Sequence, residues 1–207
     1  MPSLEELKRA AADCRACDLW ERATQTVFGA GGEEVLARLP VRAGERRAVV
    51  LVGEQPGDQE DQQGRPFVGP AGRMLDRALA AAGIERSAAY VTNVVKHFKW
   101  EPRGKRRLHS KPNQVEIAAC SRWIDGEIAA LQPRVIVCLG ATAAQALIGR
   151  DFRVTKGRGR PVPSTLAPHV VATVHPSSIL RAPDDDTREA EMRAFVDDLV
   201  VVARLLR

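Results

Sequence analysis

Segments typical of buried strands alternate with segments typical of helices, and this alternation constrains the fold more than any other feature of the chain. Continuous apolar runs, as expected for strands covered on both faces, lie at 45–54, 88–95, 134–140 and 169–176. Apolar residues at helical spacing lie at 3–13, 69–83, 113–132, 141–149 and 192–206. This order predicts an α/β fold in which a parallel sheet carries helices on both faces.

The chain carries no pattern that would divide it, so we expect a single domain over 1–207. Its 207 residues are 44% hydrophobic and 28% charged, which is the composition of a globular protein rather than a disordered one. No apolar run approaches the roughly 20 residues that cross a bilayer, and the N-terminus lacks the basic start of a signal peptide. We therefore expect a cytoplasmic monomer with no membrane partner.

Positive charge is concentrated in two segments. Residues 96–111 hold seven Lys/Arg and one Glu, and residues 150–160 hold five Lys/Arg and one Asp, giving +6 and +4. Because the whole chain is +5, everything outside these segments sums to −5. Solvated surface is the simpler interpretation of one basic run, but two on an acidic body favour a nucleic-acid binder. We expect both segments to lie on the side of the sheet that carries the site.

Polar and glycine-containing segments follow each predicted strand. They are GEQPG at 53–57, Asn93, Gly140 and HPSS at 175–178. In open parallel sheets, ligands and catalytic side chains gather beyond the carboxyl ends of the strands. These four places are therefore the candidate site.

The four cysteines indicate a metal site. Cys14 and Cys17 form a C-x2-C pair, and Cys120 and Cys138 lie in a predicted helix and strand. Four thiolates suit either zinc or a [4Fe–4S] cluster, and the spacing alone does not separate the two. The alternative is that Cys120 and Cys138 are small buried apolar residues.

Several motifs together resemble one known family. The N-terminal C-x2-C pair, GEQPG-x2-ED, RPFVGPAG, TNVVK, the two later cysteines and HPSS-x-LR resemble the family-four, iron–sulfur uracil-DNA glycosylases from Cys14 to the closing helix. The segment KRRLHSKP and the glutamine of GEQPG further resemble the X-type branch, which has a KRR-aliphatic-His loop and bonds covalently to uracil-containing DNA. Leu108 stands here where isoleucine is typical.

The resemblance implies a three-layer α/β/α sandwich around a four-stranded parallel sheet, with a [4Fe–4S] cluster on Cys14, Cys17, Cys120 and Cys138. It implies a bacterial, nucleoid-associated enzyme that acts on uracil in single- or double-stranded DNA and releases free uracil. Two alternatives remain open: turnover with water that releases an abasic site, and a non-catalytic DNA-damage binding module.

Uracil excision requires specific groups, because the base must leave the stack and take negative charge as it departs. Phe67, in a polar loop, is the expected stacking platform, or else a core anchor. Asn93 is expected to read the uracil edge with its amide, or else to form a turn. His175 is expected to donate to O2 as an oxyanion-hole group does, or else to be structural. Gln55 is expected to hold uracil or sugar, and Glu54 to stabilise the sugar cation or to cap loop amides.

His109 lies in the most basic loop, and the residues alone favour a phosphate or base contact for it. The resemblance instead implies that His109 is the nucleophile, kept neutral by the neighbouring arginines, with Glu54 holding its Nδ1–H so that Nε2 attacks C1′. For Asp58, Glu60 and Asp61 we expect only loop-ordering roles. The side chains expected to contact DNA are Arg106, Arg107, Ser177 and Arg181.

Overall fold

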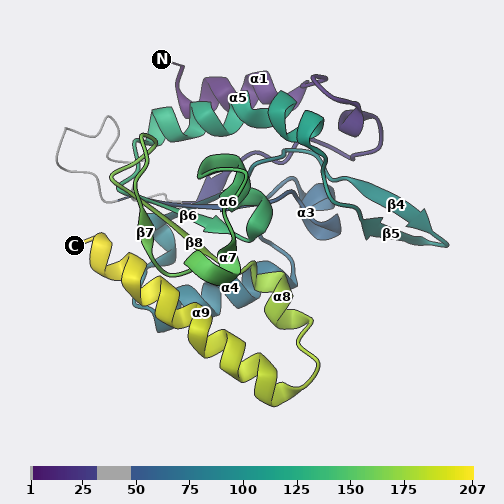
Figure 1. Cartoon of the computed structure of the whole chain (residues 1–207). Helices are drawn as coiled ribbons and strands as arrows, with labels where there is room; N and C mark the ends of the chain where they lie inside the picture. Colours follow the sequence, from purple (N-terminus) through teal and green to yellow (C-terminus); the bar gives the residue numbers. More distant parts are fainter. Residues whose placement is uncertain (1, 32–47) are drawn as a thin grey trace.

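The computed structural model describes residues 2–31 and 48–207, and a six-stranded sheet forms its middle layer (Figure 1). In the sheet order, the strands are β1 (Ala30–Gly31), β3 (Ala89–Asn93), β2 (Val49–Gly53), β6 (Val135–Leu139), β8 (His169–Thr173) and β7 (Pro161–Val162). The four inner strands are parallel, and β1 and β7 are antiparallel edges. The expected four-stranded parallel sheet is thus the centre of a larger sheet. Its two-residue edges are too short to produce a periodic pattern.

Helices cover both faces of the sheet, so the predicted three layers are confirmed (Figure 1). Alternate residues of each strand face opposite sides: Val50 and Val52 join one apolar cluster, and Val49 and Leu51 join the other. The first cluster is covered by α1 (Leu4–Ala12), α5 (Gln114–Leu131), α6 (Ala141–Leu147) and α7 (Val154–Gly157). The second is covered by α4 (Pro70–Ala81), α8 (Pro176–Leu180) and α9 (Asp185–Leu205).

Local signals explain several helix boundaries. Asn113 and Glu116 form a capping box at the start of α5, as the sequence indicates. Pro70 occupies the first turn of α4, where its missing N–H costs nothing. Two further helices occupy segments expected to be turns or loops, namely α3 (Asp58–Gln63) and the short α8. Single 3-10 turns lie at η1 (Asp18–Glu21) and η2 (Arg86–Ala88).

The basic segment at 96–111 is a β-hairpin rather than the expected loop. Its strands β4 (Trp100–Arg103) and β5 (Arg106–His109) pair only with each other and project from the body beyond α3 (Figure 1). Gly104 turns the chain with φ of 59°, a conformation that favours glycine. Abundant charge hides the alternation from which a strand is recognised.

A fully buried ion pair joins β3 to α5. Lys96 Nζ lies 2.6 Å from Glu127 Oε2, and neither side chain has any exposed surface. The ammonium also donates to Thr92 Oγ1 and to the backbone oxygen of Asn93, at 2.6 and 2.8 Å. Tyr90 donates its hydroxyl proton to Glu127 Oε1. Every polar end of the pair is therefore satisfied, which buried charges require.

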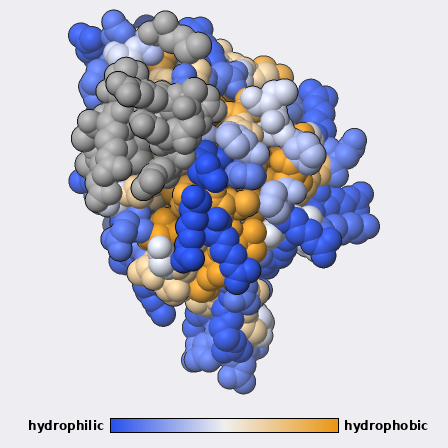
Figure 2. Space-filling model, turned by 90° about the vertical axis from the view of Figure 1, so that its left-hand side faces the viewer, coloured by the Kyte–Doolittle hydropathy of each residue, from blue (hydrophilic) through white to orange (hydrophobic). Residues whose placement is uncertain are grey.

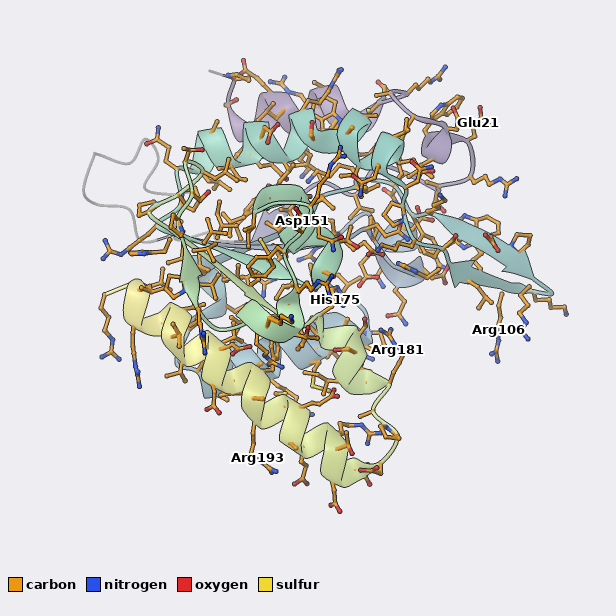
Figure 3. All side chains as sticks on the ribbon, viewed as in Figure 1. Glu21, Arg106, Asp151, His175, Arg181 and Arg193 are labelled. Atoms are coloured by element: carbon orange, nitrogen blue, oxygen red, sulfur yellow. The ribbon has the colours of Figure 1, made fainter. Side chains whose placement is uncertain are left out.

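Hydrophilic side chains cover much of the face seen in Figure 2, and hydrophobic surface is limited to areas between them. A groove of about 640 Å³ between α4 and α9 lies away from the strand ends, and Arg193, which lines it, points away from His175 in Figure 3. No helix in the described ranges is long and apolar enough to span a membrane.

Candidate active site

Four residues meet where the central strands end, and we call them the strand-end cluster: Gly53, Phe67, Asn93 and His175. A Cβ atom on Gly53 would lie 2.4 Å from Asn93 Oδ1 and 2.8 Å from Phe67 Cζ, so only glycine leaves room for both side chains. The rings of Phe67 and His175 are stacked with centroids 6.0 Å apart. The structure thus brings together three of the residues expected to handle uracil.

Phe67 combines the two roles considered for it. Its ring is 9% exposed and belongs to the apolar cluster beneath α4, yet it borders Asn93 and His175. Its backbone is left-handed, with φ of 55°, and the chain returns so closely that a Cβ on Gly72 would overlap the Phe67 oxygen. A non-glycine residue held in this conformation is typical of functional sites.

Asn93 presents an unused amide. The residue ends β3 and is only 2% exposed, and its backbone oxygen accepts from Lys96 Nζ. Its side-chain amide makes no hydrogen bond to any residue that the structure describes. A nearly buried amide with both edges unused is suited to bind a polar ligand, because polar groups in such places are normally paired.

His175 is neutral, and the proton position follows from its contacts. Burial lowers the pKa of His175 to about 4, with Arg181 and His109 adding to the shift and Glu54 opposing it. The Ser177 backbone N–H points at His175 Nδ1 at 3.2 Å. Because a backbone N–H can only donate, Nδ1 accepts, and the ring proton belongs to Nε2. The imidazole can therefore donate one hydrogen bond without carrying charge.

Glu54 connects the strand ends to the hairpin. Its Oε1 lies 3.1 Å from His109 Nε2, and its Oε2 accepts from the Thr142 hydroxyl at the start of α6. Burial raises the pKa of Glu54, but the His109 and Thr142 hydrogen bonds outweigh it and lower the pKa overall. A charged carboxylate is thus held beside an imidazole that is 51% exposed. The nitrogen facing Glu54 is Nε2, whereas Nδ1 was expected there.

Thr142 is a site residue that the sequence reasoning missed. Gly140, two residues earlier, follows a strand and was singled out for that reason. It has φ of 91°, and its Cα packs against the His175 side chain. A hydroxyl in the first turn of a helix after such a glycine is the signal that could have identified Thr142.

Two of the expected contact residues instead anchor the hairpin. The Gln55 amide donates to the backbone oxygens of Lys99 and Ser110 and accepts from the Lys99 N–H, which leaves no amide proton for uracil. Arg107 forms ion pairs with Asp58 and Asp61 at 2.5 and 2.6 Å. We therefore correct the uracil-binding role of the Gln55 side chain and the DNA-contacting role of Arg107.

The acidic residues after GEQPG do order the loops. Asp61 accepts from the Thr24 backbone and hydroxyl, and Glu60 Oε1 accepts from the Gly69 N–H at 2.7 Å. Together with the Arg107 ion pairs, these bonds hold α3 between the N-terminal segment and the hairpin. The loop-ordering role expected for these acids is confirmed.

Arg106 and Arg181 lie on the side of the molecule that carries His175 (Figure 3). Arg106 is exposed on β5, and Arg181 donates to Ser177 Oγ at 3.2 Å. In the second basic segment, Arg158 pairs with Asp198 of α9 at 2.7 Å and is 27% exposed. Its charge is compensated within the fold, so it differs from the free cation expected there.

Three of the four cysteines come together. Burial raises the pKa of Cys120 to about 11, and Cys17 and Cys14 raise it further as close neighbours. Burial also raises the pKa of Cys17, and Cys14 adds to that shift. Cys138, in the middle of β6, has its pKa raised by burial alone. In the described ranges, no three His, Cys, Asp or Glu side chains converge closely enough to hold a single metal ion.

Comparison with known proteins agrees with this site. The family model of the uracil DNA glycosylase superfamily matches residues 43–200. The chain belongs to this superfamily. Its matched region contains all four residues of the strand-end cluster, together with Glu54 and His109.

Two similar members of the superfamily are type-4 uracil-DNA glycosylases. The one from Thermotoga maritima is 36% identical over 93% of this chain and 88% of its own length. The one from Archaeoglobus fulgidus is 35% identical over 88% of this chain and 86% of its own length. A DNA polymerase of Bacillus phage SP01 is 27% identical over 76% of this chain but only 16% of its own length.

Proposed function

We propose that this chain is a uracil-DNA glycosylase that flips uracil out of DNA, breaks its N-glycosidic bond and becomes covalently linked through His109 to C1′ of the abasic sugar. The observation that carries the proposal is the 3.1 Å contact between His109 Nε2 and Glu54 Oε1, made beside the strand-end cluster. It joins an exposed imidazole to a charged carboxylate where the flipped nucleotide would enter.

Uracil recognition and departure are assigned to the strand-end cluster. The flipped base would stack on Phe67, and the free amide of Asn93 would pair with its O4 and N3–H, an arrangement that rejects the reversed pattern of cytosine. As the N1–C1′ bond breaks, its electron pair leaves with uracil. The His175 Nε2–H would stabilise the negative charge that develops on O2. The released base then takes its proton from solvent.

His109 completes the reaction at the sugar. The Glu54 carboxylate stabilises the positive charge that builds at C1′ and holds the ring proton of His109. The lone pair of the other ring nitrogen forms the bond to C1′, and Glu54 accepts the proton that the alkylated ring gives up. In the arrangement described above, Nδ1 is the nitrogen that faces away from Glu54.

Water can replace His109 in a second version of the reaction. The same carboxylate could orient a water molecule toward C1′, and the product would be an abasic site released from the enzyme. In either version the enzyme would act as a monomer on chromosomal DNA in the cytoplasm and release free uracil.

We also propose that the chain holds a [4Fe–4S] cluster. A cubane is larger than a single ion, so its ligands stand further apart than those of zinc, in agreement with three neighbouring thiols that do not converge on one point. Cys14, Cys17 and Cys120 would hold the cluster. When bound, it would tie the N-terminal segment to α5, which is a structural role.

A denaturing gel tests the proposed reaction. The protein is incubated with a labelled oligonucleotide that contains one uracil, and with a matched one that contains thymine. A heat-resistant protein–DNA band with uracil only supports the adduct. Free abasic DNA would instead establish turnover with water, and unchanged DNA with retained binding would leave a non-catalytic binding module.

A further inference from the structure

The thiol group formed by Cys14, Cys17 and Cys120 lies between three segments. Cys14 follows α1, Cys17 precedes η1 and Cys120 lies within α5. The indole N–H of Trp123, also in α5, donates to Cys14 Sγ at 3.2 Å. A four-ligand cluster at this place needs one more donor.

Cys138 does not supply that donor. It has no exposed surface, and it lies within the sheet between Val52 of β2 and Ala172 of β8. Neither Cys14, Cys17 nor Cys120 affects its ionisation, although these three affect one another. Cys138 is therefore a small apolar core residue, which is the alternative that the sequence left open for it.

His97 reaches the thiol group from two directions. The backbone N–H of the preceding residue, Lys96, donates to Cys120 Sγ at 3.2 Å. At the other end, His97 Nε2 lies 2.9 Å from Thr26 Oγ1, which in turn donates to the backbone oxygen of Ala12 at 3.3 Å. Ala12 is two residues before Cys14. The side chain thus extends from the Cys120 side of the group toward the Cys14 side.

The proton on His97 is fixed by these contacts. A threonine hydroxyl has one hydrogen, and here it is donated to Ala12, so Thr26 Oγ1 accepts from His97 Nε2–H. Nδ1 then keeps its lone pair, and it bonds to no residue that the structure describes. His97 is only 5% exposed. Metal-binding histidines usually have this arrangement, with one nitrogen donating to a protein oxygen and the other free for the metal.

We propose that His97 is the fourth ligand of the cluster, through Nδ1, and that Cys138 is not a ligand. The site would hold an iron–sulfur cluster on three thiolates and one imidazole. This inference deepens the proposed cluster and is independent of the glycosylase activity.

Iron and sulfide content in anaerobically purified variants tests the ligand set. Cys120→Ala and His97→Ala should lose most of their iron, whereas the matched control Cys138→Ala should keep the wild-type content. His97→Cys should keep the cluster, because a thiolate can take the vacated position. Its reduction potential should be lower than that of the wild type, since replacing thiolate by imidazole raises the potential of such clusters.

A spectroscopic measurement identifies the ligand even where a variant folds poorly. In reduced wild-type protein labelled with ¹⁵N-histidine, pulsed electron paramagnetic resonance should detect a strongly coupled nitrogen, and His97→Cys should lack it. The inference is overturned if no nitrogen coupling is found, if Cys138→Ala loses iron while His97→Ala keeps it, or if the site holds zinc. Uracil excision is measured separately, so its failure would not affect these outcomes.

Discussion

The strand-end cluster and the hairpin differ in how they are held. Asn93 and His175 lie at the ends of inner strands and are fixed by the sheet, and Phe67 is packed against the core. The hairpin pairs only with itself and is fastened by side chains such as Gln55 and Arg107. The groups proposed to release uracil are therefore on the rigid framework, and the proposed nucleophile is on a projecting element. This difference implies that base release and covalent capture can be separated by mutation.

The largest effect is expected from His109→Ser. It should abolish the denaturation-resistant DNA adduct, because serine offers no imidazole lone pair. Excision should remain within a few-fold, because the strand-end cluster is intact and water can reach C1′. The measurement is a gel for the adduct alongside chromatography of released uracil. An adduct that persists in this variant, or a peptide map that places the sugar on another residue, would refute the role of His109.

His175→Ala tests the other region. Loss of the Nε2–H donor should slow uracil release by about 10²- to 10³-fold, as the loss of one oxyanion-hole donor does. Adduct formation should slow in parallel, because capture follows release. Single-turnover rates of both products provide the comparison. Fast release with slow capture would place His175 in the capture step instead.

Arg107→Met should act on the hairpin alone. Without the ion pairs to Asp58 and Asp61, His109 is less well placed, and capture should slow by about 10- to 100-fold while release is nearly unchanged. Arg106→Met is the matched control on the same strand, since Arg106 makes no ion pair within the described part of the chain. It should weaken DNA binding and reduce its salt dependence without changing the ratio of capture to release. Equal effects of the two changes would contradict the anchoring role.

The smallest effect is expected from mild acid. His175 has a pKa of about 4 in the fold, against 6.5 as the ordinary value, so uracil release should be flat from about pH 7 to about pH 5 and decline only near pH 4. Unfolded chains bind this proton more readily, so the free energy of unfolding should fall as pH decreases from about 6.5 toward 4. Rate and denaturation profiles across this range check both signs. A decline in release that begins near pH 6.5 would contradict a neutral, buried His175.

The sequence predicted the parts of the molecule that depend on local patterns. The four inner strands, the long helices and the capping box at Asn113 all carry such patterns, and so does the polar segment after each strand. The roles of Gln55 and Arg107 could not be found in this way, because their partners are 44 to 55 residues away in the chain for Gln55 and 46 to 49 for Arg107. Counting cysteines selected Cys138 for the same reason: spacing says nothing of which side chains meet in space.

The buried pair of Lys96 and Glu127 has a consequence for how the molecule opens. The pair bonds to both ends of β3, to α5 and, through the Gly29 N–H, to the segment that follows η1. Opening any one of these segments alone would leave a charge without a partner in the core, at a cost of several kcal/mol. Amide hydrogens of β3 and the middle of α5 should therefore exchange with deuterium only when the whole domain unfolds, while those of the hairpin exchange from the native state.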